Sequence, residues 1–146
     1  MSNEAIRVDF YVLPGTEASA RLRFACRLTE KAYGLKHRVH LHTASATEAE
    51  RLDELLWTYR QGSFVPHDLM ASTPDDLSPV TIGDGEHQDP SGDLLINLGD
   101  AIPAFFDQFA RVAEIIDGTE DCRRLGRERY GVYRDNGYQP DTHQIS

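Results

Sequence analysis

The chain has 146 residues, with 24 acidic and 15 basic side chains and a formal net charge of -9. This length suits one domain, and 40% hydrophobic with 27% charged residues is ordinary for a soluble globular protein. The acidic excess argues against a broad cationic surface for a phosphate backbone, so any anionic partner should bind at a local site. Because Glu4, Arg7 and Asp9 interrupt the N-terminal apolar stretch, we expect no signal peptide or membrane span and a cytoplasmic location.

The N-terminal half alternates between strand and helix patterns. Residues 7–13 are rich in Val, Phe and Tyr and end at a Pro-Gly turn, which predicts a strand. Apolar spacings of three and four residues predict helices over residues 16–35 and 47–59. Residues 36–43 alternate between apolar and polar side chains and predict a strand between these helices. Residues 60–78 have no sustained period and are expected to form a long loop.

The C-terminal half continues the alternation. We expect strands over residues 80–82, 93–98 and 111–116, a short helix over 102–109 and a last helix over 120–136. The chain is therefore predicted to be a single α/β domain over residues 1–146, flexible at its extreme N-terminus and in a C-terminal tail after about residue 138. Its expected architecture is three-layer α/β/α and Rossmann-like, around a mostly parallel, mixed sheet of about five strands.

No sequence pattern for catalysis or cofactor binding is found. The turn after the first strand has neither GxGxxG nor GxxxxGK[ST], so an ordinary connection is favoured over a nucleotide site. His40 and His42 share a strand face without an evident third ligand, which favours a solvated face over a metal site. Cys26 and Cys122 lack CxxC spacing and are expected to be free thiols. We expect no catalytic residue, no metal and no cofactor.

Trp57 occupies an unusual position in the helix predicted over residues 47–59. On a helical wheel it lies away from the apolar stripe that contains Leu52. One interpretation is that the following segment, with Phe64, Val65 and Pro66, folds back and covers the ring. The other is that Trp57 and Phe64 form an aromatic anchor for another protein, because tryptophan is enriched at interface hot spots. The sequence leaves both interpretations open.

The last predicted helix carries a basic stripe in an acidic chain. Five arginines against three acidic residues give residues 121–138 a net charge of +2. The stripe consists of Arg123, Arg127, Tyr130 and Arg134. The expected core-facing stripe consists of Cys122, Leu125, Val132 and Tyr133. The basic stripe is either a solvated face, since cations are favourable near a helix C-terminus, or a site for a carboxylate-bearing peptide, because arginine pairs bidentately with carboxylates.

Several motifs resemble, in this order, the chi subunits of bacterial DNA polymerase III holoenzyme: FYVL, RLDELLW followed by SFVPH, DLLINL, and RERYxxYR. The resemblance covers the chain from the first strand to Tyr138. It implies a non-catalytic α/β accessory protein of the clamp-loader complex, acting in DNA replication. It also implies two partners, the psi subunit and the acidic C-terminal tail of single-stranded-DNA-binding protein (SSB). Contact with single-stranded DNA would be indirect, and no membrane is involved.

The resemblance also assigns residues to the two partners. The implied psi-binding residues are Trp57, Phe64, Val65 and Pro66. The implied tail-binding residues are Arg123, Arg127, Tyr130, Ile116 and Arg134. In the mechanism that follows, an arginine grips the terminal carboxylate, apolar groups receive the terminal side chain, and the other arginines attract the acidic stretch. Gly131 departs from the family, which often has lysine there, so the family's tail affinity does not transfer in full.

Two other functions stay open at this point. A nucleotide- or single-stranded-nucleic-acid-binding module would use the α/β pattern and the arginine-rich helix, and its direct DNA binding would fall steeply with salt. An enzyme acting on a phosphorylated ligand would need a cluster of polar side chains at strand ends, which the sequence does not reveal.

Overall fold

A computed structural model describes residues 6–17, 19–58, 65–69, 79–84 and 92–145. The strands are β1 (Arg7–Val12), β2 (Val39–His42), β3 (His67–Leu69), β4 (Val80–Gly83), β5 (Gly92–Asn97), β6 (Phe109–Ile116) and β7 (Asp141–Gln144). The helices are α1 (Ala20–Gly34), α2 (Ala46–Thr58) and α3 (Glu120–Asp135), with a short 3-10 turn at Phe106–Gln108.

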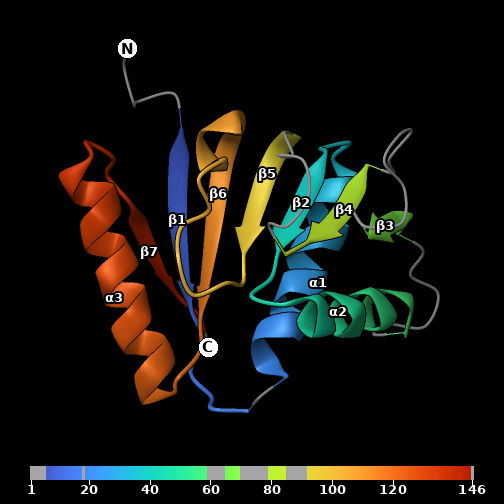
Figure 1. Ribbon diagram of the computed structural model, residues 1–146, viewed down its shortest axis with the longest axis horizontal. Helices are drawn as coiled ribbons and strands as arrows, with labels where there is room; N and C mark the ends of the chain where they lie inside the picture. The colour runs from blue at the N-terminus through green and yellow to red at the C-terminus, as the bar shows by residue number, and fades with distance from the viewer. Residues whose placement is uncertain (1–5, 18, 59–64, 70–78, 85–91, 146) are drawn as a thin grey trace.

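The strands form one sheet in the order β3-β4-β2-β5-β6-β1-β7 (Figure 1). Each neighbouring pair in the described residues runs parallel. The predicted α/β class is confirmed. Over the described residues the sheet has seven strands and is all-parallel, where a mixed sheet of about five strands was expected. No helix of the described segments is long and apolar enough to cross a membrane.

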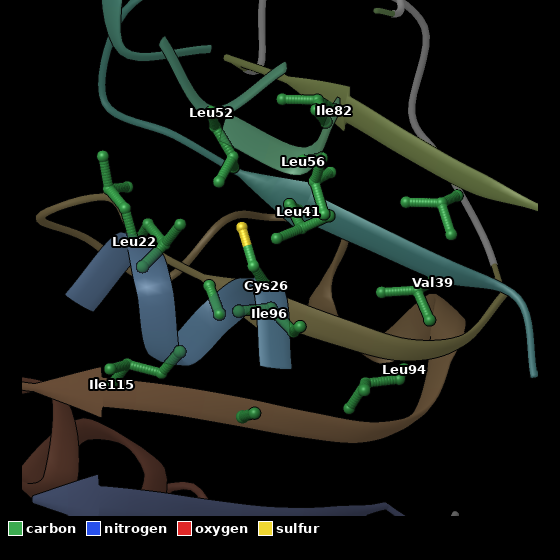
Figure 2. Close-up of a cluster of buried hydrophobic side chains, with 14 of the residues drawn as sticks. Leu22, Cys26, Val39, Leu41, Leu52, Leu56, Ile82, Leu94, Ile96 and Ile115 are labelled. Atoms are coloured by element: carbon green, nitrogen blue, oxygen red, sulfur yellow. The ribbon is translucent and has the colours of Figure 1, made fainter. Parts of the chain in front are cut away.

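Helices cover both faces of the sheet. Successive side chains of a strand point to opposite faces, so Leu94 and Ile96 of β5 face one way and Leu95 faces the other. Leu94 and Ile96 pack in a cluster with Leu22 of α1 and Leu52 of α2 (Figure 2). Leu95 belongs to a second cluster that contains residues of α3. The sheet is therefore the middle layer of three, as expected.

Two edge strands were not predicted. β3 lies within the loop expected over residues 60–78, and β7 lies where a flexible tail was expected after about residue 138. β7 pairs with β1, with Asp9 opposite Asp141. Both strands are short and lack an alternating apolar pattern, so the local sequence gives little sign of them. The N-terminal flexibility expected for residues 1–5 lies outside the described residues.

The histidines of β2 do not form a solvated face. His40 is 2% exposed, its Nδ1 lies 2.7 Å from Thr81 Oγ1, and its ring packs edge-on against Phe105. Burial and the neighbouring His42 lower the pKa of His40 to about 3, so this residue is neutral at physiological pH. The solvated-face expectation is therefore wrong for His40, because the segment before β6 covers this face of β2.

Candidate partner-binding site

Helix α3 is anchored to the sheet by a buried ion pair. Arg129 is 4% exposed, and its Nε donates to Glu114 Oε1 of β6 at 2.9 Å. The Tyr133 hydroxyl donates to Glu114 Oε2 at 2.8 Å, and the Asn97 amide donates to the same carboxylate at 3.0 Å. The Arg129 charge is therefore neutralised inside the protein, and this arginine is not part of the basic surface.

The start of α3 is fixed by a hydrogen-bonded cap. Thr119 is the N-cap residue, and its Oγ1 accepts a hydrogen bond from the Cys122 backbone N–H at 3.4 Å. Asp117 Oδ1 accepts from the Thr119 backbone N–H at 2.8 Å and from the Thr119 hydroxyl at 2.6 Å. Burial opposes ionisation of Asp117, but these hydrogen bonds lower its pKa below the ordinary value. Arg123 Nε donates to the Asp117 carbonyl at 3.4 Å, so the cap also orients the first arginine of the stripe.

A pocket of about 210 Å³ lies between α3 and the strands β1, β6 and β7. We refer to it as the α3 pocket; it is lined by Phe10, Val12, Ile116, Arg123, Gly126, Arg127, Tyr130 and Thr142. Phe10 and Tyr130 pack with ring centroids 5.3 Å apart. The described lining contains two arginines and no acidic residue. An apolar interior beside two cations suits a ligand that joins a hydrophobic group to a carboxylate.

Gly126 shapes one wall of the α3 pocket. A Cβ at this position would lie 2.7 Å from Ile116 Cδ1, closer than real Cβ contacts allow. The missing side chain therefore lets Ile116, which is 4% exposed, pack directly against the helix. Any larger residue has to displace the end of Ile116.

Strand β7 supplies the opposite side of the pocket through Thr142. The strand is held by His143, whose Nε2 lies 2.9 Å from Asp9 Oδ1 and whose ring stacks on Tyr11 at 5.0 Å. Burial opposes ionisation of Asp9, but hydrogen bonds from His143 and Arg111 lower its pKa below the ordinary value. Asp9 is therefore ionised at neutral pH and connects β7 to Arg111 of β6.

The structure gathers four of the five predicted tail-binding residues around the α3 pocket: Arg123, Arg127, Tyr130 and Ile116. Arg134 is not among the lining residues, and its Nε lies 3.5 Å from Asp135 Oδ1. Val132, expected in the core, is 50% exposed, because Arg129 and Tyr133 occupy the inner side of the helix instead. The basic stripe is therefore one turn shorter at the pocket than predicted.

Sequence reasoning missed Phe10, Val12, Gly126 and Thr142 as lining residues. Phe10 and Val12 could have been grouped from the alternation of β1, which places them on one face of the sheet. Their position beside α3 depends on the pairing of β1 with β6, which local sequence does not reveal.

A second exposed feature is Trp57 at the end of α2. Its side chain is 48% exposed, and its ring lies 4.2 Å, centroid to centroid, from His67. The buried His67 ring is positioned by the Val65 carbonyl, 2.6 Å from Nδ1, and by Asp53 Oδ1, 3.2 Å from Nε2. The fold-back interpretation is therefore only partly met, since one side of the indole is covered and nearly half remains accessible.

The other predicted psi-binding residues differ in their placement. Val65 is 2% exposed and belongs to the hydrophobic core, so it cannot contribute to a surface. Pro66 is half-buried beside His67 in the chain. Phe64 lies outside the described residues.

Comparison with solved structures relates the fold to a larger protein. A structure described as S. cerevisiae Dbp5 bound to RNA and ADP BeF3 superposes with a TM-score of 0.67 at 17% identity. The match covers 98% of this chain and 42% of that chain. At this identity the likeness concerns the fold alone.

Comparison by sequence is more specific. The family model described as "DNA polymerase III chi subunit, HolC" matches residues 6–141. The DNA polymerase III subunit chi of Pseudomonas aeruginosa is 41% identical over 139 residues, covering 95% of this chain and 96% of that protein. The corresponding subunit of Escherichia coli is 31% identical over 125 residues, covering 85% of each. The chain therefore belongs to the family of DNA polymerase III chi subunits, accessory subunits in DNA replication.

Proposed function

We propose that this chain links the psi subunit of DNA polymerase III to the acidic C-terminal tail of SSB. The tail binds in the α3 pocket, and psi binds at the exposed end of α2 around Trp57. The chain acts within the clamp-loader complex without a reaction of its own, and it reaches single-stranded DNA through SSB. The chain's overall acidity supports this indirect route, because a net charge of -9 disfavours direct binding to a phosphate backbone.

The observation that carries the tail assignment is the composition of the α3 pocket. Phe10 and Tyr130 provide apolar surface for a terminal hydrophobic side chain, and Arg123 and Arg127 provide cations beside it. Among the described residues, Arg127 has no ion pair, whereas Arg123 already donates to the Asp117 carbonyl. Arg127 is therefore the better candidate to bind the terminal carboxylate, with Arg123 attracting acidic residues upstream.

A direct test is fluorescence anisotropy with a labelled acidic peptide ending in Asp-Ile-Pro-Phe. We expect saturable binding with a free C-terminal carboxylate and a loss of about tenfold or more with Arg127→Ala or Tyr130→Ala. Arg124→Ala is the matched control, because Arg124 is on the same helix but pairs with Asp121 and Glu128 outside the pocket. Equal losses with Arg124→Ala and Arg127→Ala would reduce the site to general electrostatic attraction.

The psi assignment is supported by the exposure of Trp57. A large aromatic ring that is 48% exposed, rigidly backed by His67, provides contact area with little loss of side-chain entropy on binding. We therefore expect Trp57 and Pro66 to contact psi, together with Phe64. Val65 is omitted because it is buried.

This assignment is tested by co-purification with psi. Trp57→Ala should weaken psi binding by about 2 kcal/mol, the size typical of an interface hot spot, and leave tail binding unchanged. Arg51→Ala serves as the control, since Arg51 is exposed on the same helix and lies six residues before Trp57. Undiminished psi binding by Trp57→Ala would remove this surface from the proposal.

A further inference from the structure

A second groove, of about 230 Å³, lies along α1 on the face of the sheet opposite the α3 pocket. We refer to it as the α1 groove. Arg27, Lys31 and Leu35 line it on the helix side, and Leu94 and Arg111 line it on the sheet side. As in the α3 pocket, the described lining contains no acidic residue. Sequence analysis did not identify this groove.

The segment that contains α1 is more basic than the segment that contains α3. Six basic residues and one acidic residue give residues 20–38 a net charge of +5, compared with +2 for residues 121–138. Arg27 and Lys31 are both exposed, and neither forms an ion pair within the described part of the chain. Arg111 is different, because its Nε donates to the buried Asp9 at 3.0 Å. The charges available to a ligand are therefore those of Arg27 and Lys31.

Two leucines of α1 and its C-cap contribute aliphatic surface to the groove. Leu35 is 62% exposed at the end of α1, and Leu28 is partly buried in the same lining. Leu35 and Leu28 therefore place aliphatic surface beside the exposed cations of Arg27 and Lys31. This combination suits a ligand that carries both carboxylates and an aliphatic side chain.

The aromatic rings of the groove argue against a nucleic acid. Tyr11 packs against Phe24 at 5.4 Å and is stacked on its other partner, His143, at 5.0 Å. Phe24 is also contacted by Arg27, whose Cζ lies 5.8 Å from the ring centroid. These contacts occupy the ring faces on which bases of a single strand would stack.

We propose that the α1 groove is a second receptor for an acidic peptide segment, one in which carboxylate side chains flank an aliphatic residue. Arg27 and Lys31 bind the carboxylates, and Leu28 and Leu35 receive the aliphatic side chain. The site does not require a free C-terminus, so it is separate from the tail site proposed for the α3 pocket. Its location on the opposite face allows both sites to be occupied together.

The test uses the full chain and a fluorescein-labelled Asp-Glu-Leu-Asp-Asp-Leu peptide with an amidated C-terminus, which lacks the carboxylate required at the α3 pocket. We expect saturable binding that weakens about tenfold in the Arg27→Ala/Lys31→Ala double variant. Leu35→Ser should weaken it by a similar factor. Arg23→Ala is the control on the same helix, since Arg23 is exposed but does not line the groove.

Three results would overturn the proposal. One is the absence of saturable binding, and another is equal weakening by Arg127→Ala, which would place the peptide in the α3 pocket. The third is tighter binding of an oligothymidylate of about 15 nucleotides with the same dependence on Arg27 and Lys31, which would make the groove a nucleic-acid site. Binding that depends on Arg27, Lys31 and Leu35 but not on Arg23 or Arg127 supports it.

Discussion

Arg127 and Arg129 lie two residues apart on α3, but their side chains have opposite environments. Arg129 is buried, bonded to Glu114 at 2.9 Å and to the Asp100 carbonyl at 2.9 Å. Arg127 is exposed, lines the α3 pocket and has no ion pair among the described residues. One arginine therefore fixes the helix to the sheet, and the other is available to a partner.

The difference shows that a basic stripe counted from sequence overstates the charge that a partner meets. Five arginines give residues 121–138 their net charge of +2, but Arg129 is neutralised by a carboxylate outside this segment. Its internal ion pair instead supplies rigidity, which holds the pocket residues on the same helix in place. Stability and binding should therefore respond to different arginines.

The largest expected effect is the loss of stability on replacing Arg129, but not Arg127, by methionine. Arg129→Met leaves Glu114 buried without its charge partner and should lower the free energy of unfolding by about 3–5 kcal/mol. Arg127→Met is the matched control and should change it by less than about 0.5 kcal/mol, because the side chain is exposed. Urea unfolding of both variants measures this. Similar stabilities would contradict the division between an anchoring and a binding arginine.

Asp9, a second buried carboxylate, lies on the other face of the sheet and can be compared with the Arg129–Glu114 pair. Asp9 is held by Arg111 and His143, both partly exposed, so Asp9→Asn should cost less than Arg129→Met, about 1–3 kcal/mol. Because the folded-state pKa of Asp9 lies below the ordinary value of 3.8, its contribution is complete above that pH and is lost as pH falls below it. Urea midpoints measured from neutral to acid pH should therefore decline less steeply in Asp9→Asn. If the urea midpoints of the parent chain and Asp9→Asn decline equally toward acid pH, Asp9 does not cause the loss of stability in acid.

Gly126→Ala should lower tail-peptide affinity without a comparable loss of stability. The new Cβ would lie 2.7 Å from Ile116 Cδ1, so the end of the Ile116 side chain has to move. We expect it to move into the pocket and to lower the affinity for the tail peptide about tenfold. Stability should change by less than about 1 kcal/mol, because the better helix propensity of alanine offsets the displacement. Gly131→Ala is the control, since its nearest neighbour, Arg134 Nη2, would lie at 3.8 Å. Peptide anisotropy and thermal unfolding distinguish the two, and equal affinities would contradict the role given to Gly126.

The smallest expected effect is an increase in tail-peptide affinity. Gly131→Lys adds a cation next to Tyr130 in a position with space for a side chain, and it should raise tail-peptide affinity about twofold. It should also stabilise the helix by roughly 0.5–1 kcal/mol relative to glycine. Competition binding at low and moderate salt checks this, because a gain from exposed charge diminishes with salt. Weaker binding than the parent chain would show that Gly131 is favoured for another reason.

The helices and central strands were predictable because the helices have a regular apolar spacing and the strands are alternating or continuous apolar segments. The short apolar run of residues 93–98, for example, predicted a buried strand, and β5 lies within one residue of those bounds at each end. β3 and β7 were missed because edge strands of three and four residues gain their stability from pairing with neighbours rather than from an apolar pattern. The helix expected over residues 102–109 is only a 3-10 turn, since β6 already begins at Phe109.

The site was predictable where it lies on one helix and not where it depends on the sheet. Arg123, Arg127 and Tyr130 were grouped by helical spacing and by motif, and the structure brings them to one pocket. Thr142 and Phe10 were missed because they reach the pocket through the β7–β1–β6 order, a long-range pairing. The α1 groove was missed for a similar reason, since Arg111 and Leu94 meet α1 only in the folded sheet.

The most direct test of the central claim is a double-mutant cycle at the α3 pocket. Affinities are measured for the parent chain and Arg127→Ala, each with the free-carboxylate and the amidated form of the tail peptide. If Arg127 binds the terminal carboxylate, each single change weakens binding, and the combined change adds little, giving a coupling energy of about 1–3 kcal/mol. Additive losses, or equal binding of the two peptide forms to the parent chain, would contradict the account.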